Sequence, residues 1–172
     1  MKRSLPVLIA LILLFSIVGW SAGYWKGLRA YKKRDDETAL HHLRPLAEQG
    51  NARVQFVLGE MYYNGEGVLQ DYKTALKWYT LAAEQGNAIA QGNLGTMYAE
   101  GEGVLPDYKT AAKWFRLAAE QGFAKAQFNL GVMYAKGEGV LQDDVYAHMW
   151  WNIAASQGNK EAVENRDLVE KK

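Results

Sequence analysis

The 172-residue sequence has no cysteine, so it can form neither disulfides nor a zinc site built on thiolates. It also has no excess of charge of either sign, because 20 lysines and arginines stand against 19 aspartates and glutamates. Proteins that bind nucleic acid normally present a basic stripe, so we expect no nucleic-acid partner. Hydrophobic residues make up 49% of the chain, which is enough for a continuous core and excludes a disordered protein.

Residues that commonly carry catalysis or hold metals are scarce. The sequence has three histidines, and His41 and His42 are neighbours in an expected helix, where they would point about 100° apart and could not share one metal ion. No serine, histidine and aspartate follow an order that suggests a nucleophile and its base. We therefore predict no metal, no cofactor and no catalytic residue, and hence a protein that is not an enzyme.

The dominant feature is the pattern A-x-x-x-L-G-x-M-Y-x-x-G-E-G-V-L-x-D, which returns every 36 residues without an insertion, with Val54 in place of the first alanine. A fixed period of this length indicates a repeat array. A single unit cannot bury its apolar face, so units stack on one another and usually present an extended surface to a partner. We therefore expect binding, not catalysis. The period is set by Leu58-Gly59, Leu94-Gly95 and Leu130-Gly131.

Each unit begins with an expected helix, because its apolar positions step by three and four residues, as in Val54, Leu58 and Met61. An asparagine precedes this helix, and its short side chain can accept a hydrogen bond from an unpaired amide. Phe123 occupies that position in the unit that begins at residue 123, and its side chain cannot cap a helix. A glycine in the helix interior costs about 1 kcal/mol relative to alanine, so we expect a neighbouring helix to approach closely there. The caps are Asn51, Asn87 and Asn159, and the glycines are Gly59, Gly95 and Gly131.

A Gly-Glu-Gly loop follows, in which the glycines are free to adopt positive φ and the next Val-Leu pair is expected to make an apolar contact. An aspartate then caps a second helix. We interpret the loop glutamates as solvated and the repeated tryptophans as core between units. Trp151 replaces Tyr79 and Phe115 and is a candidate for exposure at the end of the array. The aspartates are Asp71, Asp107 and Asp143, the glutamates are Glu66, Glu102 and Glu138, and the tryptophans are Trp78, Trp114 and Trp150.

The register divides the chain into an array over residues 23–158 and a C-terminal capping helix over residues 159–172. The many charges of the capping helix suit an outer side that faces water. The first unit is abbreviated and lacks the Gly-x-Gly loop, so we expect a tight turn at Arg34-Asp35-Asp36. The units are 23–50, 51–86, 87–122 and 123–158.

One long apolar run occurs, from Leu5 to Ala22, and Lys2 and Arg3 precede it, as in an export signal. As a helix its 18 residues would be about 27 Å long, between a long signal core and a minimal membrane span. Residues 1–22 are therefore a signal peptide or an N-terminal membrane anchor. We expect a periplasmic or secreted protein, or alternatively one anchored in the inner membrane. The basic residues between 26 and 34 favour retention of this flank on the cytoplasmic side of the membrane. We interpret them instead as the outer face of the array's first helix.

Read from Asn51 to Gly122, the motif A-x-x-Q-x-x-L-G-x-M-Y-x-x-G-E-G-V-L-x-D-Y-x-T-A-x-K-W-(Y/F)-x-L-A-A-E-Q-G resembles the Sel-one-like repeat, a relative of the tetratricopeptide repeat. The resemblance is strong over residues 51–158 and weaker over 24–50. It implies an all-α fold, a right-handed superhelical solenoid of antiparallel helix pairs with a concave groove. It also implies a scaffold or adaptor that binds a protein or peptide, often exported in bacteria.

Some cysteine-rich exported relatives of this repeat are associated with penicillin binding or hydrolysis. A hydrolase of cell-wall or β-lactam substrates is therefore the alternative function. The lack of any cysteine in this chain argues against it.

The tetratricopeptide geometry, carried over position by position, places the groove on the first helix of each unit. Asparagine side chains there can bond the backbone of an extended peptide, and exposed phenylalanines would supply apolar anchors. The alternative for the phenylalanines is packing against a neighbouring helix. The predicted groove residues are Phe56, Val57, Glu60, Asn93, Thr96, Phe128, Asn129 and Val132.

Overall fold

The computed structural model describes residues 22–169, so the predicted export or anchor segment lies outside the described residues except for its last one. Every regular element of this part is a helix, and none of these helices is long and apolar enough to span a bilayer. The chain is helical over residues 22–32. The helices that follow are α2 (Asp36–Glu48), α3 (Ala52–Asn64), α4 (Tyr72–Glu84), α5 (Ala88–Glu100), α6 (Tyr108–Glu120), α7 (Ala124–Lys136), α8 (Asp144–Ser156) and α9 (Lys160–Val169).

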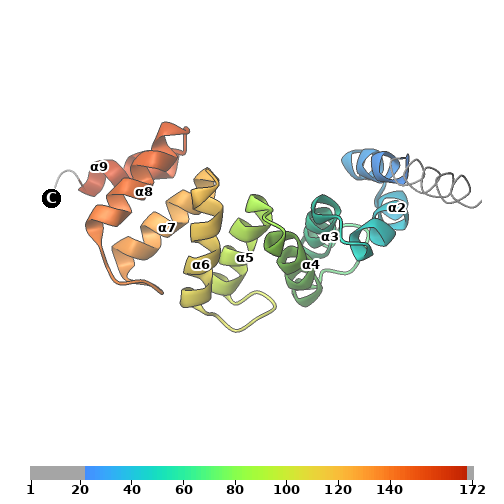
Figure 1. Cartoon of the computed structure of the whole chain (residues 1–172), viewed down its shortest axis with the longest axis horizontal. Coiled ribbons are helices and arrows are strands. Elements are labelled where there is room, and N and C mark those ends of the chain that lie inside the picture. Colours follow the sequence, from blue (N-terminus) through green and yellow to red (C-terminus); the bar gives the residue numbers. More distant parts are fainter. Residues whose placement is uncertain (1–21, 170–172) are drawn as a thin grey trace, which may run out of the picture.

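The helices form a bent array of pairs (Figure 1). We call the helix over residues 22–32, α3, α5 and α7 the first helices, and α2, α4, α6 and α8 the second helices. From α2 to α9 each helix packs against the next one in the chain, and α5 also contacts α7. The two ends of the described chain lie at opposite ends of the array (Figure 1). In the view of Figure 1 both ends lie above the middle of the array, so the array is curved. The predicted all-α solenoid is confirmed.

The helices begin at the predicted capping residues. Asn51 Oδ1 accepts a hydrogen bond from the amide of Val54 at 3.1 Å, and Asp71 Oδ1 accepts one from the amide of Thr74 at 3.2 Å. Phe123 makes no capping bond, as predicted. Equivalent capping bonds are made by Asn87, Asn159, Asp107 and Asp143.

The interior glycines of the first helices lie beneath an aromatic ring of the second helix. A Cβ atom at Gly95 would lie 2.5 Å from Cδ1 of Phe115, and Tyr79 covers Gly59 in the same way. Real Cβ atoms do not approach other atoms this closely, so a side chain at either glycine would displace the ring. The predicted close approach is confirmed, and the group that makes it is a side chain.

The expectation that Trp151 is exposed is wrong. Trp151 is 4% exposed, its ring covers Gly131, and its Nε1 donates a hydrogen bond to the carbonyl oxygen of Phe128 at 3.2 Å. The physical reason is that Trp151 occupies the position of Tyr79 and Phe115, whose rings also cover a glycine of the first helix in their own unit. In addition, α9 contributes Ala162 to the same core cluster. The other repeated tryptophans are partly buried against core clusters, as predicted: Trp78, Trp114 and Trp150.

The loops after the first helices differ from expectation in one respect. The first glycine adopts a left-handed conformation, as at Gly65 with φ of 73°, and the valine is half-buried, as at Val68. The next residue, Leu69, is 91% exposed, because the loop turns the valine towards the array and the leucine towards solvent. The expected apolar contact is therefore wrong for the leucine. Leu105 and Leu141 are exposed in the same way.

A ladder of glutamines joins the units through the core. Gln55 is 3% exposed, and its Nε2 donates a hydrogen bond to the carbonyl oxygen of Ala47 in the preceding unit at 3.0 Å. Gln85 Nε2 donates to Gln55 Oε1 at 2.7 Å, so both ends of the buried amide are paired. Because a buried polar group without a partner is costly, the ladder ties each unit to the one before it. It repeats at Gln91 with Gln121 and at Gln127 with Gln157.

Candidate peptide-binding surface

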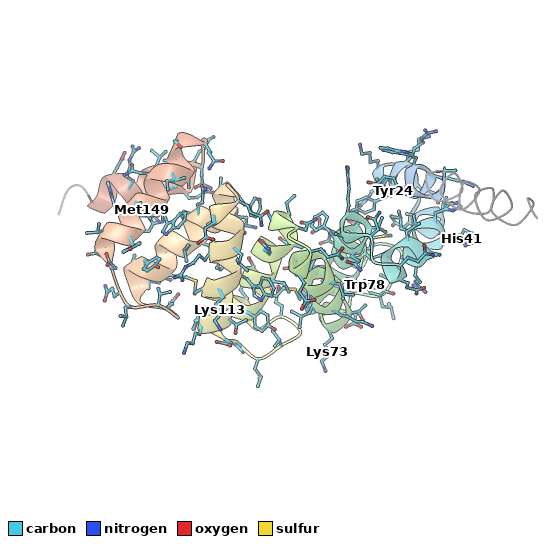
Figure 2. The ribbon with its side chains drawn as sticks, viewed as in Figure 1. Tyr24, His41, Lys73, Trp78, Lys113 and Met149 are labelled. Atoms are coloured by element: carbon cyan, nitrogen blue, oxygen red, sulfur yellow. The ribbon has the colours of Figure 1, made fainter. Side chains whose placement is uncertain are left out.

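The helix over residues 22–32 and α3 enclose a pocket of about 400 Å³, which we call the N-terminal pocket. It lies at the end of the array where Tyr24 is seen, and the ring of that tyrosine meets the ring of Trp25, a lining residue, at 5.1 Å between centroids (Figure 2). Both walls of the pocket are first helices, as the groove prediction requires. The lining residues are Trp25, Leu28, Arg29, Tyr31, Lys32, Arg53, Phe56 and Val57.

Two predicted groove residues, Phe56 and Val57, form part of the apolar floor of this pocket. Val57 is 6% exposed and belongs to the core cluster that includes Leu28. Phe56 is half-buried and packs against two core clusters, with its ring centroid 6.0 Å from that of Tyr79. Phe56 therefore packs between helices, which is the alternative considered from the sequence, and it also lines a pocket.

The basic residues between 26 and 34 are all exposed, as expected for the outer face of the first helix. Two of them, Arg29 and Lys32, also have a position that was not predicted from the sequence. Both line the N-terminal pocket together with Arg53. Trp25, Arg29 and Lys32 are spaced by four and three residues, which places them on one side of a helix. This spacing was the signal in the sequence that the two cations lie on the same side of the helix as Trp25.

A second hollow, which we call the central pocket, lies between α3, α4 and α5, with one contribution from α7, and has a volume of about 220 Å³. Tyr79 Oη donates a hydrogen bond to Glu60 Oε1 at 2.7 Å, and Asn93 Nδ2 donates to the same oxygen at 3.0 Å. Three predicted groove residues, Glu60, Asn93 and Thr96, are thus brought together. The lining residues are Glu60, Tyr63, Asn64, Tyr79, Asn93, Thr96 and Lys125.

Two tyrosines of the central pocket are held in their protonated form. Burial, followed by the hydrogen bond to Glu60, raises the pKa of Tyr79 far above its usual range. Burial, followed by the hydrogen bond to Glu102, also raises the pKa of Tyr63. Each phenol donates a hydrogen bond to a carboxylate, to Glu60 or to Glu102, so the central pocket presents a polar surface whose hydrogen bonds are already made.

The remaining predicted groove residues lie on α7, away from both pockets. Phe128 and Val132 are half-buried and pack against the core cluster that contains Trp151. Asn129 is half-buried between them in the sequence. For Phe128 the packing alternative describes its surroundings, because its ring contacts α8 and its carbonyl oxygen is bonded to Trp151.

The loop glutamates are not simply solvated, and that interpretation is wrong for Glu66 and Glu102. The Glu66 side chain is 12% exposed and pairs with Arg34 across the first two units. Glu102 Oε2 accepts a hydrogen bond from Tyr63 Oη at 2.8 Å, across the next two units. These acids lie against the preceding unit because each loop lies beside the C-terminal end of the first helix of that preceding unit. They therefore join units, and the sequence gives no sign of this beyond the repetition.

The family model described as Sel1 repeat matches the chain at residues 19–51, 52–87, 88–123 and 124–159. No curated protein sequence matches the chain. Among solved structures, a protective antigen of uropathogenic Escherichia coli strains with an SLR fold is 44% identical, with a TM-score of 0.80. The comparison covers 83% of this chain and 32% of the antigen.

Two further structures are similar. A Sel1 repeat protein from Oxalobacter formigenes is 37% identical with a TM-score of 0.80, over 84% of this chain and 59% of that protein. Cysteine rich protein B of Helicobacter pylori is 19% identical with a TM-score of 0.59, over 76% of this chain and 93% of that one, and it shares the fold. The chain thus spans less than two thirds of the length of the two more similar proteins. Four matched repeats in one continuous array place this chain in the Sel1 repeat family.

Proposed function

We propose that this protein is a scaffold or adaptor, exported or anchored in the membrane, whose first helices bind an extended segment of a protein partner. Sel1 repeat proteins are generally scaffolds without enzymatic activity, and their fold suggests interaction with proteins. The observation that supports the proposal most directly is the position of the N-terminal and central pockets, both of which open between first helices.

Several residues that line these pockets vary between units, whereas several residues that hold the units together do not. The position of Val57 is taken by Asn93 and Asn129 in the next two units, and that of Glu60 by Thr96 and Val132. In contrast, the capping aspartates and the glutamines of the ladder recur unchanged. Variation at the pocket positions is what a binding surface needs, since specificity depends on side chains that differ from pocket to pocket.

The location is a separate part of the proposal and depends on residues 1–22. Mass spectrometry of the mature N-terminus tests it. A start at Gly23 or Tyr24 supports a released envelope protein, and an intact Met1 or Lys2 supports an anchor. A chain that keeps its N-terminus and fractionates with soluble cytoplasmic proteins would contradict both.

Obstruction of the central pocket tests the binding surface. Thr96→Trp places a large ring where a partner would lie, while Lys113→Trp adds the same ring at an exposed position of α6 (Figure 2). Partner recovery after cross-linking in cells should fall with Thr96→Trp and remain at the level of the unaltered chain with Lys113→Trp. Equal recovery with both variants, at equal thermal stability, would contradict binding at this surface.

A further inference from the structure

Three cations line the N-terminal pocket, and the pKa of its Tyr31 phenol is raised by burial and by the nearby carboxylates of Glu66 and Glu60. The lining of this pocket includes Arg29, Lys32 and Arg53 and no aspartate or glutamate. None of these three side chains forms an ion pair within the described residues, where the pairs are made by Arg34, Lys136 and Arg166. In a chain of nearly balanced charge, three unpaired cations around one hollow favour a ligand with negative charge.

The floor between these cations is apolar. Leu28 and Val57 are buried, Phe56 is half-buried, and Trp25 is 59% exposed at the edge. The volume of about 400 Å³ lies within the range of about 300–1,000 Å³ that is usual for ligand pockets, so an aromatic side chain fits. Aromatic residues that enter such pockets commonly dominate affinity, and an exposed tryptophan offers a face for stacking.

The central pocket has the opposite character. It presents the Glu60 carboxylate, bonded to Tyr79 and Asn93, with Lys125 as its one cation. The position of Arg53 is also not basic throughout the array, since Ile89 stands there in the next unit. The combination of three cations and an apolar floor is therefore a property of the N-terminal pocket and does not follow from the repeat.

From this combination we propose that the N-terminal pocket binds an acidic peptide segment of the partner, with an aromatic side chain on the floor and carboxylates paired with Arg29, Lys32 and Arg53. Guanidinium groups bind carboxylates through two parallel hydrogen bonds and also stack on aromatic rings, so the two arginines suit both parts of such a ligand. This inference rests on the proposed function and names the chemistry of the segment bound. A hollow of this depth suits an inserted side chain better than the flat surface of an anionic membrane.

The test uses the full chain in neutral detergent and a fluorescent peptide with one phenylalanine flanked on each side by two glutamates. Fluorescence anisotropy should show binding that weakens with added salt. Replacement of the phenylalanine by alanine, or of the glutamates by lysines, should abolish it. Arg29→Glu combined with Arg53→Glu should weaken binding about tenfold or more. Lys160→Glu, a single reversal of charge on α9 at the other end of the array, should leave it unchanged.

One further double variant and one further probe complete the experiment. Arg29→Lys with Arg53→Lys keeps the charge and should retain most of the binding, which separates the effect from misfolding. Equal binding by the unaltered chain and the glutamate variant, or no binding of the acidic peptide, would overturn the inference. The inference would also be overturned if the unaltered chain bound vesicles of anionic phospholipid, the glutamate variant did not, and neither bound the peptide. If the peptide fails but Thr96→Trp still reduces partner recovery, the proposed function stands and only the acidic ligand is excluded.

Discussion

The ring of Phe123 occupies the space that a side chain at Gly92 would need. A Cβ atom at Gly92 would lie 2.5 Å from Cε1 of Phe123. Gly92 stands where the neighbouring units have Phe56 and Phe128, and Phe123 stands where they have a capping asparagine. The unit over residues 123–158 thus loses its cap, and the phenylalanine in its place fills the gap left by the glycine of the unit over residues 87–122.

This relationship predicts a coupled pair of substitutions. Gly92→Phe alone should destabilise the fold by about 1–3 kcal/mol through overpacking against Phe123. Phe123→Asn alone should leave an unfilled space, offset in part by a new cap worth about 1 kcal/mol. The double variant restores the residues found in the other units. Its free energy of unfolding should be about 1–3 kcal/mol higher than the value obtained by adding the effects of the two single changes. Urea denaturation of all four proteins measures this coupling, and strictly additive effects would contradict it.

The glutamine ladder predicts a large cost for an apparently conservative change. Gln91→Leu should reduce the free energy of unfolding by about 1–3 kcal/mol, because the carbonyl oxygen of Ala83 and the amide of Gln121 lose their partner. Lys113→Ala is a surface change and should remain within about 0.5 kcal/mol of the unaltered chain. If chemical denaturation shows equal stability for both variants, the ladder does not hold the units together.

The covered glycines predict opposite effects for the same substitution at two places. Gly95→Ala should destabilise the chain by about 1–3 kcal/mol, because its Cβ meets the ring of Phe115. Gly23→Ala should have no such cost, since no atom lies within 4 Å of the added Cβ and alanine favours a helix. Thermal unfolding followed by circular dichroism distinguishes the two. A stabilising effect of Gly95→Ala would show that the ring moves aside freely.

The aspartate caps predict loss of stability in acid. The hydrogen bond from the Thr74 hydroxyl lowers the pKa of Asp71, and Thr110 does the same for Asp107. The pKa of each aspartate is lower in the native chain than its unfolded value of about 3.9, so the stabilisation is present above about pH 4 and is lost as the pH falls through the native pKa. Thr74→Val should raise the pKa of Asp71 towards its usual value. Carbon-detected NMR titration of the carboxyl groups measures this, with Asp107 as the unchanged internal control.

The sequence predicted the features that repeat and missed those that depend on neighbouring units. Asn51, Asp71 and Gly95 have roles set within one unit, so the helix starts and the covered glycines followed from the pattern. The pocket position of Arg29 was missed because it depends on how the shortened first unit meets α3. Trp151 is a different case, because its ring covers Gly131 as Tyr79 covers Gly59, so the repeat itself indicated burial. The bonds of Gln55 and Glu102 join residues of different units, and a repeat pattern does not show which atoms meet across that boundary.

The predicted binding residues show the same limit. The register placed Glu60, Asn93 and Thr96 on first helices, and the structure brings them together in one pocket. The structure does not bring Phe128 and Val132 to that pocket, because both side chains pack against the core cluster that contains Trp151. Periodicity assigns a residue to a face of a helix, but the packing of the next unit determines how much of that side chain a partner can reach.

Site-specific photo-cross-linking tests binding at the first helices most directly. A photoreactive amino acid is placed in turn at Arg53, at Thr96 and, as the control on a second helix, at Lys113. After irradiation in cells, we predict that one partner is linked from Arg53 and Thr96 through neighbouring segments of its chain, and that it is not linked from Lys113. Links from Lys113 with none from the two pocket positions would contradict the proposed binding surface.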